Sequence, residues 1–294
     1  MNKLKLTAAV LAAVTALFSC RGKSGGDSVS TSPSDGGTAE DGNYPDLTVT
    51  FLDVGKADSM IIRTENSTVV IDCGEKGDGK DIVKFLENHD VTTIDYLIIT
   101  HYDKDHVGGA AKVINSFEVL NVLGPDYQEL SQETDKFRSA MKEKLIVPKM
   151  MTEELSFELD GAEYTVYAPE KDFYGLDDDN DFSLVTKLRY HGTTFIFTGD
   201  AMQQRLDEVM DIGGCDLLKI PYHGRKISNL EQFIEETSPE YAVICTSKEE
   251  FAPATREILD SNGVKYWSTC YNGSITAVSD GNSITVTAES DSLN

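Results

Sequence analysis

Apolar and polar residues alternate in short runs from Leu47 onward, and amphipathic stretches with helical spacing interrupt these runs. A period of two indicates strands, whereas apolar positions repeated every three or four residues indicate helices. The pattern predicts strands at 47–54, 59–63, 67–72, 94–99, 119–123, 155–159 and 162–168, helices at 80–89, 110–117 and 132–144, and a hairpin of 183–190 with 193–200. Because strands alternate with helices but also form hairpins, we expect an α/β fold of mixed sheets covered on their outer faces by helices.

The first 19 residues follow a different pattern. Lys3 and Lys5 precede a mostly apolar run that ends at Phe18. This run is typical of a signal peptide, since a stable membrane anchor needs about 20 apolar residues. It ends in the letters LFSC, which resemble the lipobox of bacterial lipoproteins, where the cysteine is lipidated. We therefore expect an exported protein anchored to the bacterial membrane through Cys20; the alternative is an ordinary secretory peptide in which Cys20 is incidental.

Residues 20–46 are predicted to be a disordered tether. Between Arg21 and Asp46 the only apolar side chains, prolines aside, are one Val, one Ala and one Tyr, too few to offset the entropy of ordering the segment. A coil of this Gly/Ser type would span ~25–30 Å. The remainder, 47–290, is long enough to form one catalytic domain.

The formal charge of the chain is −24, and loss of a signal peptide with two lysines would lower it further. Such a surface repels nucleic acid and anionic lipid at long range and offers no basic stripe for a DNA backbone. An anionic substrate must therefore be bound by local groups.

A cluster of ionisable side chains follows the apolar run 94–99. His101, Asp103, Asp105 and His106 stand within six residues, just before a pair of glycines. Two imidazoles and two carboxylates this close would be costly to bury without a cation between them. The cluster therefore predicts a divalent-metal site.

Four cysteines lie beyond Cys20 and contain no C-x-x-C pair: Cys73, Cys215, Cys245 and Cys270. An exported protein could pair them as disulfides, but Cys73 and Cys245 stand in apolar runs typical of buried free thiols. Both alternatives remain open at this stage.

Six segments in order resemble a known family: FLDVGKADSMII at 51–62, VVIDCG at 69–74, THYDKDHVGG at 100–109, NDFSLV at 180–185, FTGDA at 197–201 and LKIPYHGRKIS at 218–228. Together they resemble the metallo-β-lactamase superfamily, and within it the branch like the soluble hydrolase domain of ComEC-type DNA-uptake proteins. The resemblance covers essentially 47–287. It implies an αββα sandwich of two mixed sheets with one or two metals at one sheet edge.

The resemblance also implies which residues hold the metals. His101 and Asp103 would serve site one, Asp105 and His106 site two, and Asp200 would bridge the two; the best remaining imidazole for site two is His223. The aspartates of the opening motifs, Asp53, Asp58 and Asp72, are interpreted as structural groups that brace the motif loop.

Two departures from the family pattern affect these assignments. The branch usually has two consecutive histidines before Gly-Ser, whereas this chain has Tyr222-His223-Gly224-Arg225. In addition, no histidine supplies the third site-one ligand used by the lactamases proper; an Asn-x-x-Ser motif, Asn180 and Ser183, stands there. A carboxylate of the acidic loop 177–181 could complete that site. An oxygen-rich site one tolerates Mn²⁺ as well as Zn²⁺.

We expect a metallohydrolase that acts on a phosphodiester, with a metal-bound hydroxide as nucleophile. Asp105, Asp200 and His223 would be its catalytic ligands. Contacts to the substrate would come from Asn180, Ser183, Lys219 and Arg225, the last two neutralising phosphoryl charge. The family branch suggests nucleic acid as substrate, while the acidic surface favours small or single-stranded substrates.

Two alternatives remain. One is a hydrolase of the same fold that acts on a lactone, a thioester or a β-lactam, which the missing site-one histidine disfavours. The other is a degenerate, non-catalytic lipoprotein that binds a metal or ligand, motivated by Tyr222 and Arg225.

Overall fold

The computed structural model describes residues 45–175 and 179–290. The predicted signal peptide 1–19, the lipidation site Cys20 and all but the end of the tether lie outside the described residues, as do two aspartates of the acidic loop. Within the described part, no helix is both long and apolar enough to cross a membrane.

Eight strands in the described part of the chain form the first sheet, in the order β15-β14-β1-β2-β3-β4-β5-β6. Their bounds are β1 Leu47–Phe51, β2 Met60–Arg63, β3 Thr68–Ile71, β4 Thr93–Ile98, β5 Glu118–Pro125, β6 Lys149–Met151, β14 Ile275–Ser279 and β15 Ile284–Ala288. Strands β3 to β6 are parallel neighbours, and the other pairs are antiparallel. The sheet is therefore mixed, as predicted.

Seven further strands, again counted over the described residues, form the second sheet, in the order β13-β12-β11-β10-β9-β8-β7. Their bounds are β7 Leu155–Leu159, β8 Ala162–Tyr167, β9 Val185–Tyr190, β10 Thr193–Phe197, β11 Leu217–Lys219, β12 Tyr241–Ile244 and β13 Lys265–Ser268. Strands β10 to β13 are parallel, whereas β7 to β10 form antiparallel hairpins. This sheet is also mixed.

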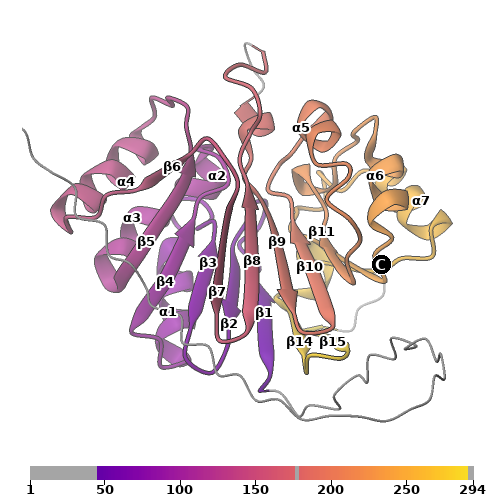
Figure 1. The fold of residues 1–294 in the computed structure, drawn as a ribbon, viewed down its shortest axis with the longest axis horizontal. Helices are drawn as coiled ribbons and strands as arrows, with labels where there is room; N and C mark the ends of the chain where they lie inside the picture. Colours follow the sequence, from indigo (N-terminus) through magenta and orange to yellow (C-terminus); the bar gives the residue numbers. More distant parts are fainter. Residues whose placement is uncertain (1–44, 176–178, 291–294) are drawn as a thin grey trace, which may run out of the picture. The chain divides into compact units, whose positions relative to one another are not determined.

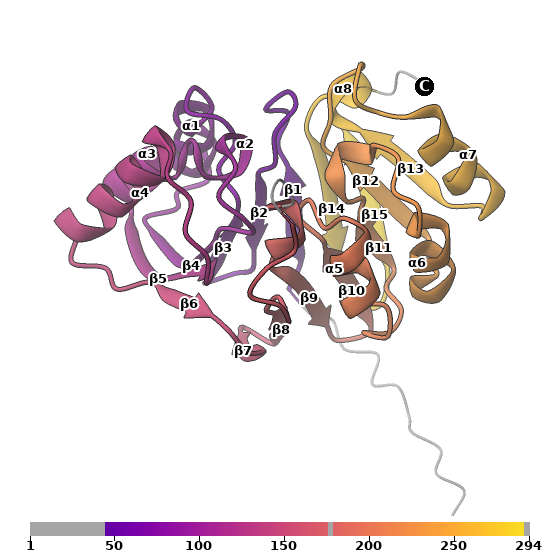
Figure 2. The same ribbon diagram turned by 90° about the horizontal axis from the view of Figure 1, so that it is seen from above.

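Helices cover the outer faces of both sheets. Those on the first sheet are α1 Gly79–Asn88, α2 Lys104–Val107, α3 Ala110–Ser116 and α4 Gln132–Glu143; those on the second include α5 Gln203–Glu208, α6 Leu230–Thr237 and α7 Pro253–Ser261, and the short helix α8 Thr269–Asn272 follows β13. Figures 1 and 2 show the two helical layers on opposite sides of the paired sheets. Helix α4 starts with a reciprocal capping box between Ser131 and Thr134, which satisfies backbone donors at its first turn.

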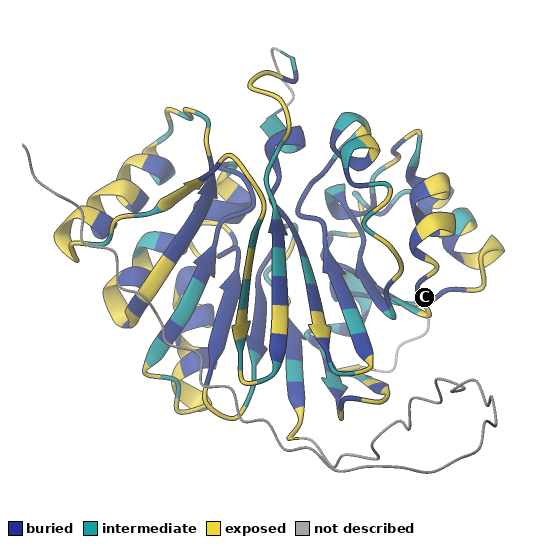
Figure 3. Ribbon diagram, in the orientation of Figure 1, coloured by how far each residue is buried: buried dark blue, intermediate teal, exposed yellow. Residues whose placement is uncertain are grey.

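Three apolar clusters hold the four layers together. The central cluster lies between the sheets and includes Phe51 and Phe197, whose ring centroids are 6.1 Å apart. The other two clusters pack α1, α3 and α4 against the first sheet, and α5, α6 and α7 against the second. Figure 3 shows that most of the central strands are buried, whereas exposed residues alternate with buried ones along the helices. Each fully buried large apolar side chain contributes roughly 1.5–3 kcal/mol to the stability of the fold. Two packed sheets with helices on both outer faces confirm the predicted αββα sandwich.

The four cysteines of the domain are free. Cys73, Cys215 and Cys245 are buried, and Cys270 is partly buried. Burial raises the pKa of Cys215 to about 12, which keeps this thiol protonated and unreactive at neutral pH. Of the two alternatives left open by the sequence, the structure has free thiols.

Several element ends differ from the sequence prediction, and the differences shape the site. The strand predicted at 47–54 ends at Phe51, because residues 52–59 leave the sheet as a loop closed by the bond from Leu52 N to Ser59 O at 3.0 Å. The strand predicted at 193–200 ends at Phe197, where Gly199 turns the chain with φ +53°. A Cβ at Gly199 would lie 2.8 Å from the Cβ of Thr100, so this turn requires glycine. The short elements β6 and α2 were not predicted, nor were the helices and strands beyond residue 200.

Candidate metal centre

The site lies where parallel strands of both sheets end. Asp72 follows β3, His101 follows β4, Asp200 follows β10, His223 follows β11 and Cys245 follows β12. The carboxyl ends of parallel neighbours meet at one edge of a sheet. The two sheets bring these edges together, since ligand atoms of His101 and Asp200 lie within 4.8 Å of each other.

Each of three buried histidines is held through its Nδ1 atom. His106 Nδ1 donates to Asp72 Oδ2 at 2.8 Å, and His223 Nδ1 donates to the carbonyl oxygen of Cys245 at 3.0 Å. His101 Nδ1 lies 3.2 Å from Thr100 Oγ1, which itself donates to Asp72 Oδ2 at 2.7 Å. A partner on Nδ1 fixes the tautomer and leaves the Nε2 lone pair available for a metal.

The Nε2 atoms of these three histidines have no hydrogen-bond partner in the described part of the chain, and the same holds for Asp200 Oδ1. They nevertheless face carboxylates. Asp200 Oδ2 lies 3.4 Å from His106 Nε2 and 3.0 Å from His223 Nε2, and Asp105 Oδ2 lies 3.4 Å from His223 Nε2. Buried polar atoms are rarely left unsatisfied, and donors that converge in this way suit a divalent cation. The residues therefore fit the metal that the family pattern implies.

Charge in the site is strongly coupled. Burial lowers the pKa of His223, but the neighbouring carboxylates of Asp200 and Asp105 outweigh this effect and raise it to about 9. For Asp200 the directions are reversed. Burial raises the pKa of this carboxyl, but the neighbouring His223 and His106 hold it well below its usual range. The cluster thus stabilises positive charge placed between its carboxylates.

The predicted ligands are not equally well placed. Atoms of Asp105, His106 and His223 form one group within 4.8 Å, and atoms of His101, His106 and Asp200 form another. Asp103 stands apart, with its side chain 44% exposed and Oδ2 3.7 Å from His101 Nε2. The donors of site two are thus more complete than those of site one.

His223, not Tyr222, faces this cluster. Tyr222, His223 and Gly224 all have positive φ, at 50°, 51° and 74°, a conformation that costs of order 1–3 kcal/mol for each non-glycine residue. The turn directs the Tyr222 side chain away, where its hydroxyl accepts a bond from Arg225 Nη1 at 2.9 Å. The guanidinium of Arg225 also lies 4.8 Å from the centroid of the Tyr222 ring.

Two residues expected to contact substrate are buried instead. Lys219 is fully buried, forms an ion pair with Asp58 and donates to the carbonyl oxygen of Gly199 at 2.8 Å. Ser183 is also fully buried, and its Oγ accepts a bond from the Asp200 backbone N at 3.1 Å. Both side chains therefore support the turn that carries Asp200, and their burial does not favour the predicted contact with substrate.

The other expected substrate contacts are partly exposed. Arg225 forms an ion pair with Glu250, while Asn180 Nδ2 donates to Met202 Sδ at 3.7 Å. In the acidic loop, Asp181 Oδ1 accepts bonds from the backbone N atoms of Met202 and Arg205 at the start of α5. This contact accounts for the Asp181 carboxylate without a role in site one.

Asp58 and Lys56 are two participants that sequence reasoning did not assign to the site. Asp58 is fully buried, and its carboxylate belongs to a group with Asp200 and His223 that could hold a metal. Lys56 Nζ lies 3.0 Å from Asp105 Oδ2. The motif at 51–62 was the available signal, but it did not show how close the loop comes to the ligands.

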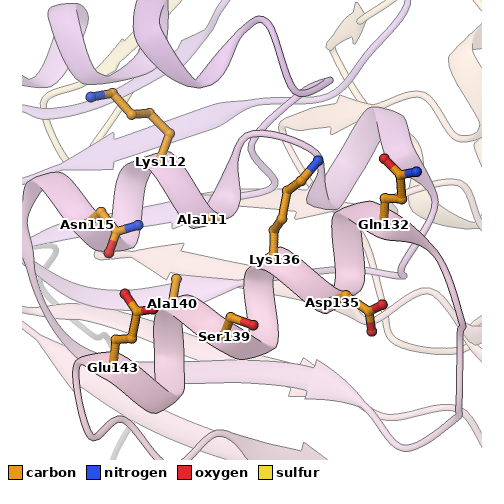
Figure 4. Close-up of a pocket in the computed structure, with 9 residues that line it drawn as sticks. All are labelled: Ala111, Lys112, Asn115, Gln132, Asp135, Lys136, Ser139, Ala140 and Glu143. Carbon is orange, nitrogen blue, oxygen red and sulfur yellow. The ribbon is translucent and has the colours of Figure 1, made fainter.

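The groove formed by α3 and α4, of about 530 Å³, offers no comparable chemistry. Its lining residues are Ala111, Lys112, Asn115, Gln132, Asp135, Lys136, Ser139, Ala140 and Glu143. Figure 4 shows these polar side chains spread along the two helices rather than pointing toward one another. The groove has no histidine or cysteine among these residues, so the buried cluster is the stronger candidate.

Comparison with known proteins matches the motif regions to one family. The model described as "Metallo-beta-lactamase superfamily" matches residues 52–248, which include every metal-ligand candidate named above. The match begins in the loop after β1 and ends just beyond β12.

Two curated relatives each match more than two thirds of this chain. ComE operon protein 3 of Bacillus subtilis is 26% identical over 262 residues, covering 79% of this chain and 33% of the relative. Recombination protein 2 of Haemophilus influenzae is 21% identical over 211 residues, covering 69% of this chain and 25% of the relative. The chain thus spans a third or less of the length of these relatives.

A solved structure has the same fold. The metallo-beta-lactamase fold protein YhfI from Bacillus subtilis superposes with a TM-score of 0.55 at 10% identity, covering 76% of this chain and 96% of that protein. At this identity the similarity concerns the fold alone.

Proposed function

The chain belongs to the metallo-beta-lactamase superfamily, and from this membership we propose that it is a metal-dependent hydrolase of phosphodiesters. The observation that carries the proposal is the set of three buried histidines. Each is fixed through Nδ1, and each directs an Nε2 atom without a hydrogen-bond partner in the described chain toward carboxylates. With a divalent cation bound, these Nε2 atoms would serve as its ligands.

Asp105, His106, Asp200 and His223 would hold one divalent ion, and His101 with Asp103 and Asp200 would hold a second, Zn²⁺ or Mn²⁺. A bound metal would supply a Lewis acid that polarises a phosphoryl oxygen and lowers the pKa of water. The residues around the ligands hold them in position. Asp72 and the Cys245 carbonyl fix two imidazole rings, and Ser183 holds the backbone of Asp200.

The two carboxylates nearest the centre have separate tasks. Asp105 is 5% exposed, and its Oδ2 reaches the rim of the site, so it would orient the attacking water and accept its proton. Asp200 lies deeper, between His106 and His223, where it would share its charge between the two ions. Burial of both groups excludes bulk water, which strengthens their electrostatic effects.

Phosphodiesters are favoured over other substrates for two reasons. The similarity to ComE operon protein 3 and Recombination protein 2 supports a ComEC-like branch, and the oxygen-rich site one lacks the third imidazole found in the lactamases proper. With a formal charge of −24, the chain repels long polyanions. We therefore propose a small or single-stranded phosphodiester, with nucleic acid fragments among the candidates.

A substrate panel tests this proposal. With the purified domain saturated with Mn²⁺ or Zn²⁺, bis-(p-nitrophenyl) phosphate should be hydrolysed with a higher kcat/KM than a lactone, a thioester or a chromogenic cephalosporin. A preference for one of the other three would move the protein to the alternative of the same fold. Full metal content with no turnover of any substrate would make it a non-catalytic binding protein.

The proposal includes attachment to the membrane through Cys20, which rests on the pattern at 1–20. We expect Cys20→Ala to shift the protein from the membrane fraction to the soluble fraction while domain activity is unchanged, because the tether separates the anchor from the site. Fractionation followed by a high-salt wash checks this result. A variant that remains with the membranes after the wash would rule out the lipid anchor.

A further inference from the structure

Lys56 stands at the rim of the metal centre. Its Nζ lies 3.0 Å from Asp105 Oδ2, and its side chain is 35% exposed whereas that of Asp105 is 7% exposed. The ammonium group therefore contacts both solvent and an inward-facing carboxylate. No other lysine in the described residues forms an ion pair with Asp105.

The loop between β1 and β2 fixes this position. Gly55 turns the chain with φ +70°, and its backbone N donates to Asp53 Oδ1 at 3.2 Å. Two residues beyond Lys56, the Asp58 backbone N donates to the carbonyl oxygen of Asp105 at 3.2 Å, and the Asp58 carbonyl oxygen accepts from Gly74 N at 2.8 Å. Because these bonds join the loop to the ligand-bearing segment, Lys56 stays beside Asp105.

The other cations near the centre are already engaged. Lys219 is fully buried and paired with Asp58. Arg225 is paired with Glu250 and donates to the hydroxyl of Tyr222. Lys56, by contrast, pairs with a carboxylate that a divalent ion would also bind.

An exposed carboxylate makes another part of the rim unfavourable for an anion. Asp103 is 44% exposed and contacts His101. A phosphate approaching the ligands is thus repelled by Asp103 and attracted by Lys56.

We propose that Lys56 binds the phosphate group of the substrate, an assignment that rests on the proposed phosphodiesterase function. Without a bound cation, Lys56 neutralises Asp105. Once a divalent ion shares that carboxylate, the ammonium can donate to a non-bridging phosphate oxygen at the rim. Hydrogen bonds of this kind, between charged partners, are short and strong. Lys56 therefore replaces the buried Lys219 as the lysine that contacts the substrate.

Calorimetric titration of diethyl phosphate into Mn²⁺-saturated protein tests the inference. This probe is a phosphodiester monoanion with poor leaving groups, so its binding is measured apart from turnover. Lys56→Met should weaken its affinity roughly ten- to a hundredfold, the loss expected for a hydrogen bond between charged groups, and Lys56→Arg should retain most of it. Lys104→Met is the matched control: Lys104 lies in α2, is 70% exposed and pairs only loosely with Glu75, at 3.8 Å.

A titration with Mn²⁺ alone separates phosphate binding from a positioning role. Lys56→Met should bind Mn²⁺ as tightly as wild type, or more tightly, because a competing cation has been removed. Weaker Mn²⁺ binding with unchanged probe affinity at metal saturation would mean that Lys56 only positions Asp105, and would overturn the inference. Unchanged probe affinity in Lys56→Met, or failure of the metal-loaded wild type to bind the probe, would also overturn it.

These outcomes differ from those that test the proposed function. A wild-type protein that binds diethyl phosphate through Lys56 but hydrolyses no phosphodiester would end the proposed activity and leave the Lys56 assignment in place. Hydrolysis that is equally efficient, with an unchanged KM, in wild type and Lys56→Met would support the proposed activity and reject the Lys56 assignment.

Discussion

His223→Ala should lose the metal of site two and nearly all hydrolysis, whereas Tyr222→Phe should keep the metal. The Nε2 atom of His223 faces both Asp105 and Asp200, at 3.4 and 3.0 Å, and the site has no second imidazole at Tyr222 to replace it. Loss of a ligand should cost more than the ten- to hundredfold that follows loss of a group that only orients a ligand. Metal affinity by calorimetry and kcat/KM on the same samples would measure both effects.

Tyr222→Phe is the matched control, because it removes only the hydroxyl that accepts a bond from Arg225. We expect at most a modest fall in rate for this variant. The opposite assignment, in which position 222 supplies the ligand, predicts different results. His223→Ala would then be tolerated, and Tyr222→His would bind metal more tightly than wild type. Either of these results would reject the placement of His223 at the centre.

Asp200→Ala should have a comparable effect on both metals. Its carboxylate lies between His106 and His223, and Lys219 Nζ is 3.6 Å from Oδ1. Removal of this shared negative charge leaves the imidazoles and a buried ammonium without their common partner. We expect loss of most of the metal and a fall in kcat/KM of at least about a hundredfold, since metal activation of water supplies the nucleophile.

Asp200→Asn is the control for shape, since it preserves side-chain volume and the backbone bond to Ser183 but not the charge. It should resemble Asp200→Ala in activity and remain folded by circular dichroism. Metal content by elemental analysis completes the comparison. Turnover close to wild type with full metal content would remove Asp200 from the mechanism.

Much of the fold could be predicted because its determinants are local. Strand alternation and helix spacing located β1 to β5 and β7 to β10, and the motif 100–109 placed a ligand cluster directly after the buried strand β4. No element beyond residue 200 was predicted, so β11 to β15 and α5 to α8 were all missed. Within the part that was assigned, the elements missed were β6 and α2, which have three and four residues. Elements this short carry too few positions to show a period.

The side chains around the ligands were harder to predict, because long-range contacts decide them. Lys219 stands at the end of β11, where a polar residue usually meets solvent, yet Asp58 from a distant loop covers it and neutralises its charge. Ser183 is buried for a similar reason, because its hydroxyl accepts a hydrogen bond from the backbone N of Asp200. Lys56 reaches Asp105 only because the loop after β1 is tied to the ligand segment. The residues of each pair are far apart in the sequence, so no regular spacing could have predicted these contacts.

The most direct measurement is the initial rate of bis-(p-nitrophenyl) phosphate hydrolysis as metal is titrated into chelator-treated protein. The donors of His101, His106, Asp105, Asp200 and His223 predict that the metal-free protein is inactive. The rate should then rise with added Mn²⁺ or Zn²⁺ and level off at one or two equivalents per chain. A rate that is independent of metal, or that stays absent when the ions are bound at that stoichiometry, would contradict a metal-dependent phosphodiesterase.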